Sequence, residues 1–241
     1  MSRFPATHAS VFERIRSDNH DVRLGAFSDL AAGYWKPAYH YVRLQWRLTP
    51  EEAEDVVQGF FAVALEKSYL EKFDPAKARF RTFLRTCLDR FLQNQRAAAH
   101  AIKRGGSTQT LSLDAPGADR ELAQMPAGEW EPDDIFERET TRSVLALAAE
   151  DLRQACLAEG RPIVYDTFAR HDLRDDVRTY ASVAAELGIP VTQVTNHLHA
   201  ARRRFRDLAL ARLRSLSGTD AEFRADARAL FGVDVDGADG D

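Results

Sequence analysis

The chain has 241 residues, of which 44% are hydrophobic and 29% are charged, and its formal net charge is −4. This much apolar material can form a buried core, so the composition excludes a wholly disordered chain, and the length fits one domain or two small ones. Apolar runs are too short for a membrane-spanning helix, and the first residues lack the apolar stretch of a secretory signal. We therefore expect a soluble, cytoplasmic protein.

Cysteine and histidine spacing gives no sign of a metal site. The two cysteines, Cys87 and Cys156, form no CxxC pair, so we expect core residues without a disulfide or a structural zinc. His197 and His199 are two residues apart, and on a helix their side chains diverge by about 200°, too far to share a metal. The sequence predicts no catalytic residue, no metal, no cofactor, and a protein that is not an enzyme.

Charge divides the chain into four segments. Residues 1–106 carry +5, residues 107–134 carry −6, residues 135–216 carry +2, and residues 217–241 carry −5. Segment 107–134 also holds prolines and glycines among scattered apolar residues, which is typical of a linker. We predict two domains, 1–106 and 135–216, joined by this acidic linker and followed by an acidic tail. Basic stripes in the two domains are compatible with DNA contact made alongside another subunit.

Apolar residues recur at helical spacing almost everywhere, and no strand pattern is present. The sequence therefore predicts an all-α fold of two small helical domains. Near the start we expect helices over 21–33 and 36–48, with Pro37 in the first turn of the second. A second helical block is expected over 133–216, and a short amphipathic helix over 219–231.

A further helix is predicted over 51–66, where Thr49 and Glu52 can form a capping box. Its predicted buried face consists of Ala53, Val56, Val57, Phe60, Phe61, Ala64 and Leu65. Residues 71–79 are expected to form a loop. The helix after this loop has apolar residues at the same spacing, namely Phe80, Phe83, Leu84, Cys87, Leu88, Phe91 and Leu92.

Residues 180–206 have the spacing of a helix-turn-helix. A short helix is expected to end at Leu187, Gly188 can supply the left-handed turn residue, and a second helix is expected from about Val191. The small Ala184 allows the two helices to cross closely. We expect the shared core to consist of Val183, Leu187, Val194 and Leu198.

The exposed face of the second helix predicts DNA binding. Short polar side chains that can reach base edges are Thr192, Gln193, Thr195, Asn196 and His199, and Arg202 and Arg203 can neutralise phosphates. The alternative is a plain helical hairpin whose arginines are only solvated. We favour DNA binding because the turn glycine, the small residue, the polar face and the arginines coincide.

Three separated segments carry a family resemblance. They are residues 54–61 (EDVVQGFF), residues 73–84 with FDP followed by RFRTFL, and residues 198–204 (LHAARRR). Together and in this order they resemble an RNA polymerase sigma factor of the sigma-70 family, extracytoplasmic-function (ECF, group IV) type. Residues 4–7 (FPAT) and 58–61 (QGFF) further resemble a subgroup linked with serine/threonine kinases.

The resemblance implies a function in transcription initiation without catalysis. The first domain would bind the clamp helices of the polymerase β′ subunit and the −10 promoter element, and the second would bind the −35 element and contact the β flap. Regulation by an anti-sigma factor or by a serine/threonine kinase is also implied. The predicted polymerase-binding residues are Glu51, Glu54, Asp55 and Gln58, an acidic and polar stripe opposite the apolar one. From spacing alone, an ordinary solvated face is the favoured interpretation of this stripe, and the resemblance reverses that preference.

The same resemblance places recognition and melting of the −10 element on the loop and helix that follow. This step needs cations for phosphates and aromatic platforms for unstacked bases. The predicted residues are Lys72, Phe73, Lys77, Arg79, Arg81, Arg85, Gln93, Asn94, Arg96, Lys103 and Arg104. Phe80 and Phe83 are instead expected in the core.

Two other functions remain open from the sequence. One is a free-standing helix-turn-helix regulator whose N-terminal block dimerises; it would bind specific DNA tightly without polymerase. The other is a small helical enzyme, which has little support because no cluster of catalytic residues can be identified.

Overall fold

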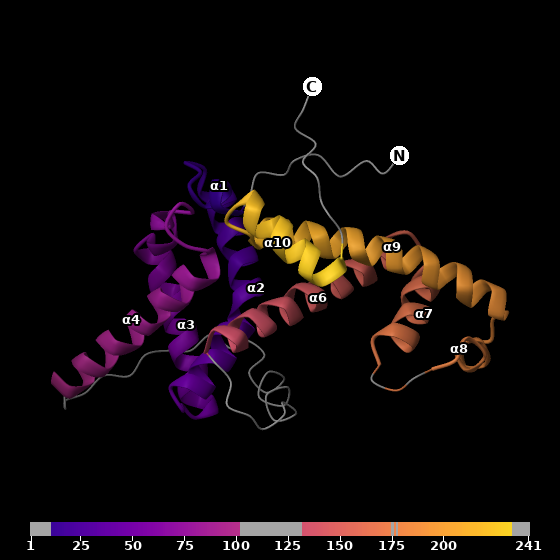
Figure 1. The fold of residues 1–241 in the computed structure, drawn as a ribbon, viewed down its shortest axis with the longest axis horizontal. Helices are drawn as coiled ribbons and strands as arrows, with labels where there is room; N and C mark the ends of the chain where they lie inside the picture. The colour runs from indigo at the N-terminus through magenta and orange to yellow at the C-terminus, as the bar shows by residue number, and fades with distance from the viewer. Residues whose placement is uncertain (1–10, 102–131, 175, 177, 233–241) are drawn as a thin grey trace. The chain divides into compact units, whose positions relative to one another are not determined.

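The computed structural model of the chain describes residues 11–101, 132–174, 176 and 178–232. Every regular element among these residues is a helix, which confirms the predicted all-α fold (Figure 1). No described helix combines the length and the apolar character needed to cross a membrane. The elements are α1 (Val11–Ile15), α2 (His20–Gln45), α3 (Pro50–Glu66), the 3-10 helix η1 (Tyr69–Lys72), α4 (Phe80–Ala101), α6 (Pro132–Ala158), α7 (Pro162–Asp172), α8 (Tyr180–Leu187), α9 (Val191–Leu216) and α10 (Asp220–Phe231).

The chain divides into two compact units whose boundaries differ from those expected. The N-terminal unit comprises Met1–Ser143 with Ser215–Ala225, and the C-terminal unit comprises Val144–Arg214 with Asp226–Asp241. Residues 135–143, predicted in the second domain, therefore belong to the first unit. The predicted linker lies outside the described residues except where its last residues open α6. The tail predicted from residue 217 contains α10, which confirms the short helix expected over 219–231.

Helix α2 is one continuous helix where two were predicted. Asn19 caps its start, because the side chain of Asn19 accepts from the N–H groups of Asp21 and Val22. Pro37 lies in the helix interior and not in a first turn, so that prediction was wrong. An interior proline costs about 3 kcal/mol. Tertiary packing offsets this cost, since Pro37 and both flanking turns of the helix are buried.

Helix α3 begins as predicted. The side chain of Thr49 accepts from the N–H of Glu52, and the Glu52 carboxylate accepts from the N–H of Thr49, which confirms the capping box. The predicted apolar face is buried except for Leu65, which is 39% exposed. At 100° per residue, Leu65 lies about 110° from the centre of the buried stripe, which explains its exposure.

An aromatic core holds the N-terminal unit together. The ring of Phe80 lies 4.4 Å from that of Phe12 and 5.2 Å from that of Tyr34, measured between centroids. The ring of Phe136, near the start of α6, stacks on Tyr34 at 6.2 Å and meets Tyr41 edge-on at 6.0 Å. The start of α6 therefore completes the core of this unit, which explains why it does not belong to the second.

A buried hydrogen bond between a histidine and a glutamate reinforces the same contact. Nδ1 of His40 on α2 lies 2.7 Å from Oε2 of Glu139 on α6, and neither side chain is more than 1% exposed. Because a buried charge without a partner is costly, this pair specifies how the start of α6 lies against α2.

Replacing Phe136 with alanine tests this placement. Phe136 is 2% exposed, and Phe136→Ala leaves a cavity beside Tyr34, so we expect the free energy of unfolding in urea to fall by about 3–5 kcal/mol. Leu157→Ala is the matched control, because Leu157 lies on the same helix but is 47% exposed; its effect should stay below about 0.5 kcal/mol. Equal losses for the two variants would contradict a core position for the start of α6.

Candidate nucleic-acid interface

The turn between α8 and α9 has the predicted helix-turn-helix form. The side chain of Thr179 caps α8 by accepting from the N–H of Ser182 at 3.1 Å. Gly188 ends α8 with φ 65° and ψ 31°, and the N–H groups of Gly188 and Ile189 both donate to the carbonyl of Ala184. The left-handed conformation explains why glycine occupies this position.

One side of α9 is buried against the rest of the C-terminal unit. Val194, Leu198 and Ala201 are at most 1% exposed. They share a core with Val183 and Ala184 of α8, while Leu187 is partly buried against it. The predicted core of the helix-turn-helix is therefore confirmed, and the orientation of α9 about its own axis is fixed.

The opposite side of α9 carries a straight row of exposed polar side chains. Thr192, Asn196, His199 and Arg203 follow one another at spacings of four, three and four residues, and all four are exposed. At 1.5 Å per residue this row extends about 16 Å, a length that fits a major groove. Thr195 and Gln193 are also exposed, on either flank of the row.

Arg202 lies on the flank of this row, where a carboxylate holds it. Its Nε and Nη2 donate to Oδ2 and Oδ1 of Asp172, each at 2.7 Å. Arg203 differs, since no carboxylate in the described part of the chain pairs with it. Of the two arginines predicted to bind phosphates, the structure leaves Arg203 available. Sequence reasoning missed Asp172, which is 30 residues away and carries no local signal.

Two residues predicted to contact the −10 element are buried instead. Phe73 is 3% exposed, and its ring lies 5.1 Å from those of both Phe12 and Phe80. It is a core residue, which periodicity could not reveal because Phe73 lies in a loop. Arg81 is 6% exposed and forms an ion pair with Glu137 of α6. These two predictions therefore need correction: neither side chain is presented to solvent.

The other residues predicted for the −10 element lie at or near the surface. Lys77 pairs with Asp74 at 3.1 Å, and the guanidinium of Arg96 lies 4.5 Å above the ring of Trp46. Exposed members of the set are Lys72, Lys77, Arg79, Gln93, Asn94 and Arg96, and Arg85 is half-buried. Lys103 and Arg104 lie outside the described residues.

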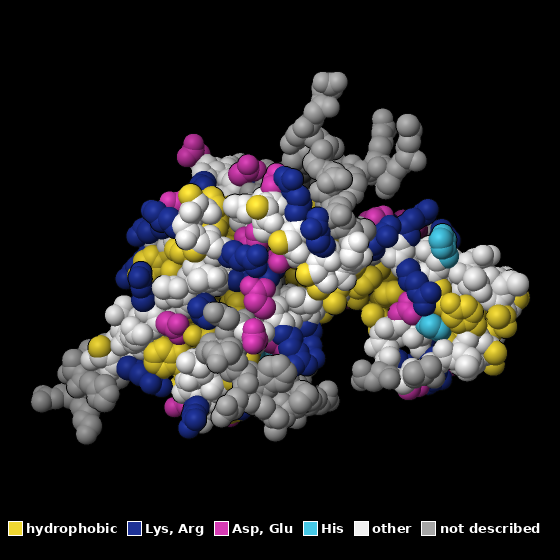
Figure 2. All heavy atoms as spheres, viewed as in Figure 1, with side chains coloured by type: hydrophobic (Ala, Val, Ile, Leu, Met, Phe, Trp, Pro, Cys, Tyr) yellow, Lys and Arg dark blue, Asp and Glu magenta, His cyan; other side chains and the backbone are white. Residues whose placement is uncertain are grey.

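The acidic face of α3 is open to solvent. Glu51 and Asp55 are exposed, and Glu54 and Gln58 are half-exposed. Nε2 of Gln58 donates to Oε1 of Glu54 at 3.0 Å, so these two side chains lie together on the surface of the helix. Elsewhere, acidic and basic side chains are interspersed over the face seen in Figure 2. A docking surface on α3 would therefore be a local feature.

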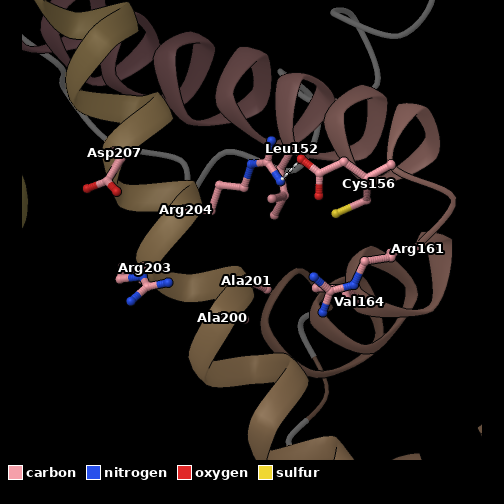
Figure 3. Close-up of a pocket in the computed structure, with 10 residues that line it drawn as sticks. Leu152, Cys156, Arg161, Val164, Ala200, Ala201, Arg203, Arg204 and Asp207 are labelled. Atoms are coloured by element: carbon pink, nitrogen blue, oxygen red, sulfur yellow. Dashed lines mark ion pairs between the residues drawn. The ribbon is translucent and has the colours of Figure 1, made fainter. Parts of the chain in front are cut away.

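A cavity of about 220 Å³ lies between α6, α7 and α9 in the C-terminal unit (Figure 3). Its floor is apolar and includes Val164 and Ala201, while its rim carries charges of both signs. Nη1 of Arg204 pairs there with Oε1 of Glu159 at 2.6 Å. Burial raises the pKa of the Cys156 thiol at the cavity, which keeps the sulfur protonated and weakly nucleophilic.

The described residues contain no group of three or more His, Cys, Asp or Glu side chains placed to hold a metal ion. Comparison of the chain with known protein families, with curated proteins and with solved structures finds no match.

Replacing Gly188 with alanine tests the turn. A Cβ there meets no atom within 4 Å, but φ is +65°, so Gly188→Ala should cost about 1–2 kcal/mol in free energy of unfolding. Gly25→Ala, inside α2 and without a positive φ, is the control and should leave stability unchanged or raise it by about 0.5–1 kcal/mol. Both are measured by chemical denaturation. A Gly188→Ala variant as stable as the parent would show that the turn does not need glycine.

Proposed function

We propose that the chain is an RNA polymerase sigma factor of the ECF type, which binds core polymerase and directs it to promoters without catalysing a reaction. The observation that carries this proposal is the exposed row Thr192, Asn196, His199 and Arg203 on the second helix of a helix-turn-helix. A cytoplasmic location follows from the proposal, because an initiation factor acts where the polymerase transcribes DNA.

The row has the chemistry for reading a major groove. An asparagine amide can pair with both N6 and N7 of adenine, and threonine and histidine offer single hydrogen bonds to base edges. An arginine can bind guanine or neutralise a phosphate. Asn196 and His199 lie in the middle of the row, and Arg203 follows them. In this proposal α9 reads the −35 element, and Arg203 holds the helix to the DNA backbone.

The acidic face of α3 supports the polymerase contact. Glu51, Glu54 and Asp55 present three carboxylates on one helix face, which suits a basic partner helix. The sequence resemblance assigns this segment to the clamp helices of the β′ subunit. In the proposal the surface residues of η1, the following loop and α4 take the −10 element, and the C-terminal unit also meets the β flap.

Charge reversal on α3 tests the polymerase contact. Glu54→Lys with Asp55→Lys places two cations against a basic partner, so the full-length variant should no longer co-elute with purified core polymerase in gel filtration. Asp18→Lys with Asp21→Lys changes the net charge equally at exposed positions outside α3 and should leave co-elution intact. Helix content by circular dichroism should be the same for both. If the α3 variant still bound core polymerase, this docking surface would be wrong.

Neutralising Arg203 tests the DNA contact. Arg203→Gln removes one phosphate cation, so the slope of log affinity against log salt should become shallower by about 0.9. Arg153→Gln removes the same charge from a half-exposed residue of α6 that pairs with Glu150, and it should leave the slope unchanged. The slopes are measured by fluorescence anisotropy on DNA selected from a random library. An unchanged slope for Arg203→Gln would remove Arg203 from the interface.

The alternative function, a free-standing regulator, predicts a different result in the same assays. Such a protein would bind its selected DNA tightly without polymerase and would not co-elute with the core enzyme. Co-elution followed by promoter-specific initiation is expected only of a sigma factor.

A further inference from the structure

Asp172, the last residue of α7, joins that helix to α9. Its carboxylate accepts two hydrogen bonds from the guanidinium of Arg202, both 2.7 Å long. Nδ1 of His171 lies 2.6 Å from the same carboxylate, at Oδ1. The Asp172 side chain is 21% exposed and that of Arg202 is 46% exposed, so the carboxylate is partly shielded from solvent while the guanidinium stays at the surface. This is a bidentate, charge-assisted contact, the strongest class of side-chain hydrogen bond.

The end of α7 also reaches α8, the first helix of the helix-turn-helix. The ring of His171 packs on the ring of Tyr180, the first residue of α8, at 5.0 Å between centroids. Nε of Arg170 donates to Oε1 of Glu186, near the end of α8, at 3.0 Å. The last turn of α7 is therefore bonded to both helices of the motif.

Arg202 is placed for this contact and not for the exposed row. At 100° per residue, Arg202 lies about 90° around α9 from the centre of the exposed row, on the flank that faces α7. To bind a phosphate, Arg202 would have to release the Asp172 carboxylate and break both of its 2.7 Å hydrogen bonds. Burial raises the pKa of the Asp172 carboxyl, but the hydrogen bonds from Arg202 and His171 outweigh burial and leave this pKa below its ordinary value.

We infer that Asp172 is a positioning residue of the DNA-binding surface: by holding Arg202, it fixes α7 and α8 against α9 and so fixes the orientation of the exposed row. The inference rests on the proposed function, because it takes α9 to be the helix that binds DNA. It also changes the role of Arg202, which acts within the protein as the partner of Asp172.

A positioning role for Asp172 and simple electrostatics predict opposite changes in DNA affinity when the carboxylate is removed. Removing a carboxylate from a DNA-binding unit lowers the repulsion between protein and phosphates, which alone would strengthen binding to any DNA sequence. Losing a positioning contact would weaken binding to the preferred sequence only, because the phosphate cations stay in place. The two effects are therefore separable by comparing a specific with a non-specific duplex.

The test uses the full-length chain and two duplexes, one selected from a random library by the wild-type chain and one with that sequence scrambled. Asp172→Asn should lower the affinity for the selected duplex about tenfold, the loss expected of one charged hydrogen-bonded contact. Its affinity for the scrambled duplex should be no lower than that of the wild type, as for any variant that removes a carboxylate. Arg202→Gln should also lower the affinity for the selected duplex, and it should leave the slope of log affinity against log salt unchanged. Asp172→Glu keeps the carboxylate and should retain more affinity than Asp172→Asn.

Asp176→Asn is the matched control. Asp176 lies four residues further along and pairs with Arg178 at 2.5 Å, so the control removes the same charge without touching α9. It should bind both duplexes at least as tightly as the wild type does. A rise in affinity for both duplexes with Asp172→Asn, or a shallower salt slope with Arg202→Gln, would show that Arg202 is a phosphate contact and would overturn the inference.

A second measurement separates this inference from the proposed function. Amide hydrogen exchange over residues 180–187 should be faster in Asp172→Asn than in Asp176→Asn, whether or not DNA is present. If the wild type binds no selected duplex, the proposed function fails. The comparison of amide exchange between Asp172→Asn and Asp176→Asn still tests whether Asp172 fixes α8. Equal exchange in the two variants would overturn the inference. If Asp172→Asn is globally unfolded, the same measurements on Arg202→Gln and Asp172→Glu test the inference.

Discussion

The burial of one side of α9 is the constraint on which the rest of the candidate site depends. Val194, Leu198 and Ala201 are excluded from water by α8 and the remaining core of the C-terminal unit. Since a helix has a fixed angular spacing, burying these residues leaves Thr192, Asn196, His199 and Arg203 no position except the solvent side. Gly188 makes this arrangement possible, because its left-handed conformation turns the chain sharply enough for α8 to pack on α9.

Ion pairs then determine which of the many cations remain available. A lysine or arginine that binds a carboxylate of its own chain has to give up that partner before it can bind a phosphate. Arg81 is buried in the N-terminal unit and committed to Glu137, and Arg202 is committed to Asp172. In the loop before α4, Lys77 also pairs with Asp74, but its side chain is 81% exposed, so this pair is easily exchanged for a phosphate. The exposed Arg79 and Arg96, together with Arg203, fit the proposed contacts with DNA.

Patterns that lie within a few residues of one another were predictable, and contacts between distant residues were not. The capping box at Thr49, the glycine turn and the apolar side of α9 follow from spacings of three to eight residues, and the structure confirms them. The pairs formed by Arg81 and Arg202 join residues 56 and 30 positions apart, so nothing local could reveal them. The same reason explains the continuity of α2 through Pro37, which depends on packing from all sides.

Promoter-directed transcription by purified components tests the central claim most directly. Core RNA polymerase is combined with the full-length chain on linear templates selected by that mixture from a random library, and the products are sized as run-off transcripts. The proposal predicts transcripts of one defined length that require the chain, and that disappear when Glu54 and Asp55 are both replaced with lysine. Selected DNA that binds the chain alone, together with no chain-dependent transcript on any template, would contradict it.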